Sequence, residues 1–236
     1  MTPSSPTTPG GDGPDDLPDH SVDGVKGERR APVVITVLIA MALPFGMPAP
    51  LTFGPRWIIP ALLGVILVVM LVTDPGRIDR RSVAVRTVRL ALIVVLAIDA
   101  AVATGRLVAD IIGGGSGTSS ASDLLRGGSI TWLHLVIAFG FLYWELDRGG
   151  PGERAHRTGR KPDLLFPQDT VPDAAPVGWR PVFVDYLYLG LTDALAFSPT
   201  DAMPLTHWAK SAMAIESVAS LVVLGLVVAR AVNILS

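Results

Sequence analysis

Apolar residues in this chain gather into six long runs that are separated by polar or Gly- and Pro-rich segments. A helix rises about 1.5 Å per residue, so about 20 apolar residues are needed to cross the roughly 30 Å of hydrocarbon in a bilayer. Each run approaches this length and holds few charges, which is typical of membrane-spanning helices. The predicted spans cover residues 31–49, 55–73, 90–105, 130–146, 182–198 and 211–232.

The composition agrees with this pattern. Half of the 236 residues (50%) are hydrophobic, only 17% are charged, and the mean hydropathy is +0.49, which is well above what a soluble domain of this size needs to build a core. The sequence therefore predicts an all-α integral membrane bundle of about six spans, with the lipid bilayer as its surroundings. Residues 1–30 are rich in Pro, Gly, Ser, Thr and Asp and predict a disordered cytoplasmic tail.

The positions of the basic residues indicate how the spans are oriented, because Lys and Arg in short loops mark the cytoplasmic side of a membrane. Six crossings with both termini cytoplasmic place 15 of the 19 basic residues on one side. The segment 182–198 is therefore interpreted as a true span; the alternative is five spans plus a re-entrant, pore-type helix. The predicted regions are a four-span part at 31–146, a basic cytoplasmic loop at 147–180 and a C-terminal helical hairpin at 181–236.

Four ionisable residues fall inside the predicted spans, namely Asp99, His134, Asp193 and Glu216. Such groups cost several kcal/mol in the middle of a bilayer, so they normally face protein or water and are candidates for function. With alternating spans, all four lie between the midplane and the outer third of the membrane and share one polar cavity. The sequence predicts a proton or cation site there, and the alternative is that the same groups only form hydrogen bonds between helices.

Helical spacing adds detail to two of these residues. Glu216 shares a face with Ser220, next to Ser217, which gives the last helix a single polar stripe. Asp193 shares its face with Gly190, and a glycine at that place allows another helix to approach closely. A buried carboxyl group without a cation partner favours its protonated form, because the charged form loses its hydration.

Other polar and aromatic residues are assigned to the edges of the membrane. Asp185 and Glu145 are expected at the cytoplasmic boundary, and Asp201 in a short external turn. Tryptophan prefers the level of the lipid headgroups, and the five tryptophans lie near the predicted span ends. They are Trp57, Trp132, Trp144, Trp179 and Trp208.

Several classes of function are not indicated by the sequence. The chain has no cysteine, and its four histidines are scattered, so we expect no metal site and no cofactor. It carries neither a nucleophile with a partnered base nor an intramembrane protease signature, and we expect it not to be an enzyme. A net charge of −2 gives no reason to expect nucleic acid as a partner. A second copy of the chain or another membrane protein remains open as a partner.

The C-terminal fifth of the chain resembles the pore domain of bacterial potassium channels. The likeness lies in the aromatic opening "DYLY", in Asp201, Pro204 and Thr206 before a basic residue, and in Glu216 early in the last helix. The resemblance implies a pore helix, a filter loop and an inner helix. The filter is degenerate, because the matching place reads "DALAFSPTD" and lacks the glycines that let backbone carbonyls face an ion.

Most of the chain is also similar to an uncharacterised group of multi-spanning membrane proteins from high-GC actinobacteria. The similarity lies in the stretches "KGERRAPVV", "DPGRIDRRS", "FGFLYWELDRGGP" and "FVDYLYLGLTDALAFSPTDAMPL". This resemblance implies a multi-pass protein of the bacterial cell (inner) membrane. Together with the buried charges, it favours a channel-like or transporter-like membrane protein for protons or cations. The alternative is a structural or accessory membrane subunit without transport activity.

Overall fold

The computed structural model describes residues 27–52, 54–73, 78, 82–156, 159–195 and 202–235, and the described part is mostly helical. The larger helices are α1 (Ala31–Gly46), α2 (Ile58–Thr73), α3 (Val83–Gly113), α4 (Ala121–Leu146), α7 (Phe183–Ala194) and α8 (His207–Leu235). The smaller elements are η1 (Ala49–Leu51), η2 (Ser116–Thr118), η3 (Asp147–Gly149), α5 (Pro151–Ala155), β1 (Leu164–Leu165), α6 (Pro167–Thr170), η4 (Pro172–Ala174) and β2 (Met203–Pro204).

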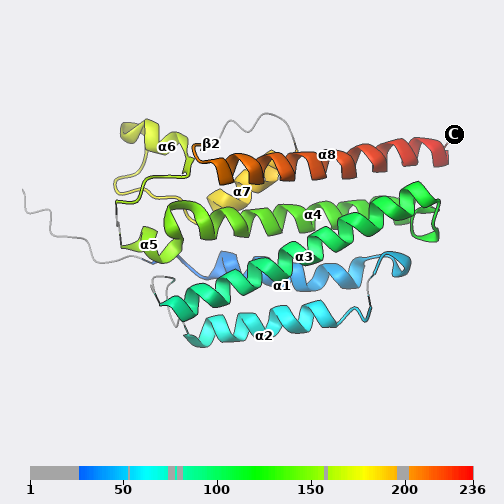
Figure 1. Ribbon diagram of the computed structural model, residues 1–236, viewed down its shortest axis with the longest axis horizontal. Coiled ribbons are helices and arrows are strands. Elements are labelled where there is room, and N and C mark those ends of the chain that lie inside the picture. Colours follow the sequence, from blue (N-terminus) through cyan, green and yellow to red (C-terminus); the bar gives the residue numbers. More distant parts are fainter. Residues whose placement is uncertain are drawn as a thin grey trace, which may run out of the picture.

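Three helices, α3, α4 and α8, are long and apolar enough to cross a membrane. The helices α1 and α2 are apolar but shorter, with 16 residues each. The prediction of a helical protein with membrane-spanning segments is therefore supported at this coarse level. In Figure 1 these five helices lie side by side along the long axis of the molecule, and the small elements α5, α6 and β2 gather at one end.

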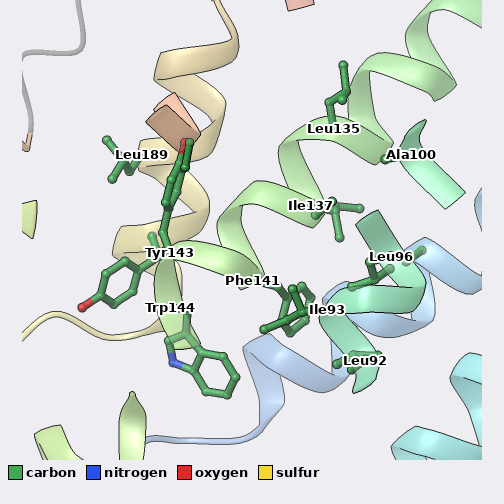
Figure 2. Packing of buried hydrophobic residues seen from close by; sticks show 14 of the residues in the cluster. Leu92, Ile93, Leu96, Ala100, Leu135, Ile137, Phe141, Tyr143, Trp144 and Leu189 are labelled. Atoms are coloured by element: carbon green, nitrogen blue, oxygen red, sulfur yellow. The ribbon is translucent and has the colours of Figure 1, made fainter. Parts of the chain in front are cut away.

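Helix α4 is the centre of the bundle, since it packs against α1, α3, α7 and α8. Figure 2 shows how its two sides are used: Ile137 and Phe141 meet Leu92 and Leu96 of α3, whereas Tyr143 and Trp144 lie on the side of α7. This explains why α4 buries far more of its length than α3 or α8, whose outward faces carry exposed Val, Ile and Leu side chains. An apolar outer surface of this kind is what a lipid-facing helix requires.

The C-terminal part is not the antiparallel hairpin that six spans require. Helix α7 has 12 residues, which is about 18 Å and too short for a bilayer. Its last turn lies beside the third turn of α8, where Ser217 bonds Asp193, and the two helices run parallel. The chain must therefore turn back after α7 before α8 begins.

The return of the chain is fixed by a short antiparallel pairing. Strand β2, just before α8, pairs with β1, which follows the C-terminal end of α4. The indole Nε1–H of Trp208 also donates to Asp163 at 2.9 Å. Helix α8 thus starts at the end of the bundle where α7 also starts, and the described N- and C-terminal residues lie at opposite ends (Figure 1). The expected arrangement with residues 182–198 crossing outward and 211–232 crossing back differs from this.

The boundary between tail and bundle also differs from the expected one. Residues 1–26 lie outside the described residues, but Glu28 is only 5% exposed and its backbone pairs with Ile78. The polar segment 147–180, expected as a solvated loop, contains short elements and a buried residue, Arg154. The reason in both cases is charge pairing, because Arg154 and Glu28 form a buried ion pair at 3.2 Å.

The tryptophans are not all interfacial. Trp144, expected as an anchor at the headgroup level, is fully buried, and its Nε1–H donates to Glu28 at 2.9 Å. Trp132 donates to Ser220 of α8, also at 2.9 Å. Trp57 is 64% exposed, as an anchor would be. The difference arises because an indole N–H that finds a buried acceptor can enter the core at little cost.

Candidate functional site

Three polar side chains from three helices meet where α7 ends inside the bundle. Tyr143 of α4 donates its hydroxyl to Glu216 of α8 at 2.6 Å, and the same hydroxyl lies 3.5 Å from a carboxyl oxygen of Asp193 on α7. The two carboxyl groups are within hydrogen-bonding reach of each other. Asp193 is 1% exposed and Glu216 is fully buried. We call Tyr143, Asp193 and Glu216 the acidic cluster.

Two serines tie the last turn of α7 to α8 beside the acidic cluster. Ser217 donates to Asp193 Oδ1 at 3.0 Å, and Ser220 donates to the backbone carbonyl of Ala194. The last carbonyls of a helix have no partner within the helix and carry a partial negative charge. The end of α7 therefore adds backbone acceptors to a place that already holds two carboxyl groups.

Small residues bring α7 close enough to α4 for these contacts. A Cβ atom on Gly190 would lie 3.1 Å from the carbonyl oxygen of Val136 and 3.3 Å from the backbone nitrogen of Gly140. A Cβ atom on Gly140 would in turn lie 3.1 Å from the Cα of Leu187. The prediction that Gly190 permits close helix approach is confirmed, and the approach sets the depth of Asp193 in the bundle.

The chemistry of the acidic cluster follows from what each atom can donate or accept. Among the described residues, no basic side chain pairs with Asp193 or Glu216. In the part of the chain that the structure describes, one buried oxygen, Glu216 Oε1, has no donor. An ionised carboxylate can only accept, so two carboxyl groups within reach of each other are compatible when they share at least one proton. Three helices thus enclose two neighbouring carboxyl groups and a tyrosine hydroxyl.

The other two predicted residues form a separate pair. Asp99 of α3 and His134 of α4 lie 2.9 Å apart, measured from Oδ2 to Nε2. His134 and Tyr143 are nine residues apart on α4, which is about 13 Å along the axis. Asp99 and His134 line a cavity to which neither Asp193 nor Glu216 contributes. The expectation that all four residues share one cavity is therefore not met, and they form two sites.

A third polar group, not anticipated from the sequence, closes the end of the bundle where α7 begins. Glu28 accepts hydrogen bonds from Trp144, from Arg154 and from the backbone N–H of Phe183, the first residue of α7. Asp147 accepts from the hydroxyl of Tyr186 and from the backbone of the β1 strand. These bonds hold the start of α7 in place and so support the position of Asp193 at its other end.

The two carboxylates assigned to the membrane boundary have different environments. Asp185 accepts the N–H of Val182 at 2.7 Å and caps the start of α7, as a residue at a helix N-terminus commonly does. Glu145 is fully buried and forms an ion pair with Arg89 at 2.7 Å. Glu145 was expected at the interface, but it is buried, because the buried Arg89 neutralises its charge there.

Asp201, expected in an external turn, lies outside the described residues. In the part of the chain that the structure describes, no three His, Cys, Asp or Glu side chains are grouped so that they could hold a metal ion.

No protein-family model matches the chain, and no match was found among curated proteins or solved structures. The likeness to a potassium-channel pore and to an actinobacterial group therefore stays a prediction from the sequence. Function has to be argued from the acidic cluster, the Asp99–His134 pair and the arrangement of the helices.

The sequence did not predict that Tyr143 and Ser217 would bond the carboxyl groups of the site. Tyr143 lies in a run of aromatic residues, where nothing distinguishes a hydroxyl that bonds a carboxyl from one at the interface. Ser217 was noticed beside Glu216, but its partner on α7 lies 24 residues away. The spacing of polar residues along one helix shows which face they share but not which helix that face meets.

Proposed function

We propose that this chain is a multi-pass membrane protein with five spans, α1, α2, α3, α4 and α8, and that α7 is a re-entrant helix. The parallel course of α7 and α8 and the short length of α7 support this arrangement. In it, the end of the bundle that holds the β1–β2 pairing faces the cytoplasm of a bacterial cell, and α8 ends on the other side.

The positive-inside rule agrees with this proposal as well as with six spans. When α8 crosses outward, Lys210 moves to the cytoplasmic side and Arg230 to the outer side, so 15 of the 19 basic residues stay cytoplasmic. The outer side then holds Arg56, Arg106, Arg126 and Arg230. The charge count is equal for the two arrangements, and the direction of α8 has to be measured.

Single-cysteine labelling decides the direction of α8, because the chain has no cysteine of its own. We expect Asn233→Cys and Ser119→Cys to react with a membrane-impermeant maleimide on intact cells. Arg160→Cys is expected to react only after the membrane is broken. Ser119 lies at the η2 end of the bundle and Arg160 at the opposite end, and both are exposed. Labelling of Asn233→Cys only after lysis, together with Arg160→Cys, would support six spans instead.

For function, we propose that the acidic cluster carries protons across the middle of this bundle. The observation that carries the proposal is that α7 ends inside the bundle, where its last carbonyls lie close to two buried carboxyl groups. Helices that stop within a membrane commonly place their ends at ion or proton sites. The tyrosine and the two carboxyls form a continuous chain of exchangeable protons.

Protons fit the acidic cluster better than larger cations do. Asp193 and Glu216 are at most 1% exposed, and both lie in hydrogen bonds to the neighbouring helices. A cation would need several oxygen ligands at once, and most oxygens here already accept a hydrogen bond. A proton needs only one acceptor at each step.

The complete burial of the cluster also favours a second candidate, a structural or accessory subunit. In that case Tyr143, Asp193 and Glu216 bind α4, α7 and α8 together and carry nothing. Hydrogen bonds between membrane helices contribute about 0.6 kcal/mol on average, so their loss is measurable but modest. The two candidates differ in what happens to flux and to stability when a carboxyl is replaced by its amide.

The test is proton flux into liposomes that contain the purified protein and an enclosed pH-sensitive dye. We expect Glu216→Gln and Asp193→Asn each to lower the flux at least tenfold, because an amide cannot release a proton to its neighbour. Asp173→Asn is the control, since Asp173 is an exposed carboxylate in η4. No flux in the unchanged protein, with lower thermal stability in both amide variants, would favour the structural candidate.

A further inference from the structure

The cavity that Asp99 and His134 line, separate from the acidic cluster, lies among η1, the start of α2 and the sides of α3 and α4. Its volume is about 450 Å³, which is within the range of small-molecule sites. The walls are almost entirely apolar, and three ionisable residues line it: Arg56, Asp99 and His134. The main apolar residues are Pro44, Met47, Leu51, Ile59, Ile98 and Val102.

The Asp99–His134 pair presents a hydrogen-bond acceptor to this cavity whatever its protonation state. His134 Nδ1 lies 3.0 Å from the carbonyl oxygen of Ile130, and a carbonyl can only accept, so Nδ1 carries a proton. His134 Nε2 faces Asp99 Oδ2 at 2.9 Å. A carboxyl group keeps an oxygen that can accept a hydrogen bond whether it is ionised or protonated, so the second oxygen of Asp99 remains an acceptor.

Asp99 is the member of the pair that a ligand can reach. Its side chain is 16% exposed, whereas that of His134 is 3% exposed.

The remaining ionisable residue, Arg56, selects against cations. It is exposed in the turn before α2 and lines the same cavity, so a positively charged molecule meets a like charge there. We propose that this cavity binds a neutral lipophilic alcohol or phenol whose hydroxyl donates a hydrogen bond to Asp99. The apolar body of the molecule lies against the Ile, Val, Leu, Met and Pro side chains of the walls.

The experiment compares two probes that differ only in the hydrogen-bond donor, para-octylphenol and its methyl ether, para-octylanisole. Binding of each is measured by equilibrium dialysis against the purified full chain in detergent micelles, with protein-free micelles as the reference for partitioning. We expect the phenol to bind about tenfold more tightly than the ether, because a buried hydrogen bond to a carboxylate is lost in the ether. Equal binding of the two probes, or binding of neither, would overturn the proposal.

Three variants locate the site, and two of them form a matched pair. Asp99→Leu removes the acceptor and is expected to abolish the preference for the phenol while the ether still binds. Ile98→Trp fills the cavity and should weaken both probes, whereas Ile112→Trp, on the same helix but outside the cavity, should weaken neither. A preference for the phenol that survives in Asp99→Leu or in Ile98→Trp, with the variant still folded by circular dichroism, would place binding elsewhere and contradict the proposal.

Discussion

Arg89→Met is expected to lower the free energy of unfolding by about 3–5 kcal/mol. Arg89 is 3% exposed and its Nε lies 2.7 Å from the fully buried carboxylate of Glu145. The substitution keeps most of the volume of the side chain but leaves the buried carboxyl group of Glu145 without its closest partner. The measurement is thermal and denaturant-induced unfolding of the purified protein in detergent, followed by circular dichroism.

Arg86→Met is the matched control, because Arg86 lies one turn earlier on α3 and faces the same carboxylate. Its side chain is 47% exposed and its Nε is 3.8 Å from Glu145, so solvent screens most of the attraction. We expect a change of about 0–1 kcal/mol. Replacing both Arg89 and Glu145 by Met should recover much of the stability lost in Arg89→Met, since no unpaired charge then remains. Equal losses for Arg86→Met and Arg89→Met would mean that burial does not decide the strength of this pair.

The sequence predicted the long helices well but not the direction of α8 relative to α7. Runs of apolar residues mark α3, α4 and α8 because a lipid-facing or core-facing helix needs them along its whole length. The apolar run at 182–198 is nearly long enough to cross a bilayer, but the helix Phe183–Ala194 covers only part of it. The basic residues do not distinguish the two arrangements, because Lys210 and Arg230 exchange sides and the number on the cytoplasmic side stays the same.

Part of the candidate site was also predictable. Asp193 and Glu216 were identified because an ionisable group in an apolar run needs a partner, and the structure brings these two residues together. Their grouping with Asp99 and His134 assumed that the spans alternate in direction, which placed all four residues at a similar depth. The grouping is wrong because α8 runs parallel to α7.

The buried charges at the end of the bundle where α7 begins were missed for a different reason. Glu28 finds its partners 116, 126 and 155 residues further along the chain. A glutamate that follows a polar tail gives no sign of contacts at such distances.

Gly190→Val is expected to destabilise the protein by about 1–3 kcal/mol and to displace the acidic cluster at the same time. The added Cβ would lie 3.1 Å from the carbonyl oxygen of Val136 and 3.3 Å from the backbone nitrogen of Gly140. Both atoms belong to the backbone of α4 and cannot rotate away, so α7 itself has to move. Glu216 Oε1 lies 3.4 Å from the same Cβ, in ordinary contact, so the cluster is disturbed through the movement of α7.

Gly225→Val in α8 separates this packing effect from the general effect of valine in a helix. Apart from the neighbouring backbone of α8 itself, no atom of the described residues lies within 4 Å of the position a Cβ would take at Gly225, so the unfolding temperature should stay unchanged or rise slightly. If both variants unfold at the temperature of the unchanged protein, α7 does not pack against α4 through Gly190. If Gly190→Val alone is destabilised and also loses proton flux, the close approach of α7 and α4 is required both for folding and for the acidic cluster to work.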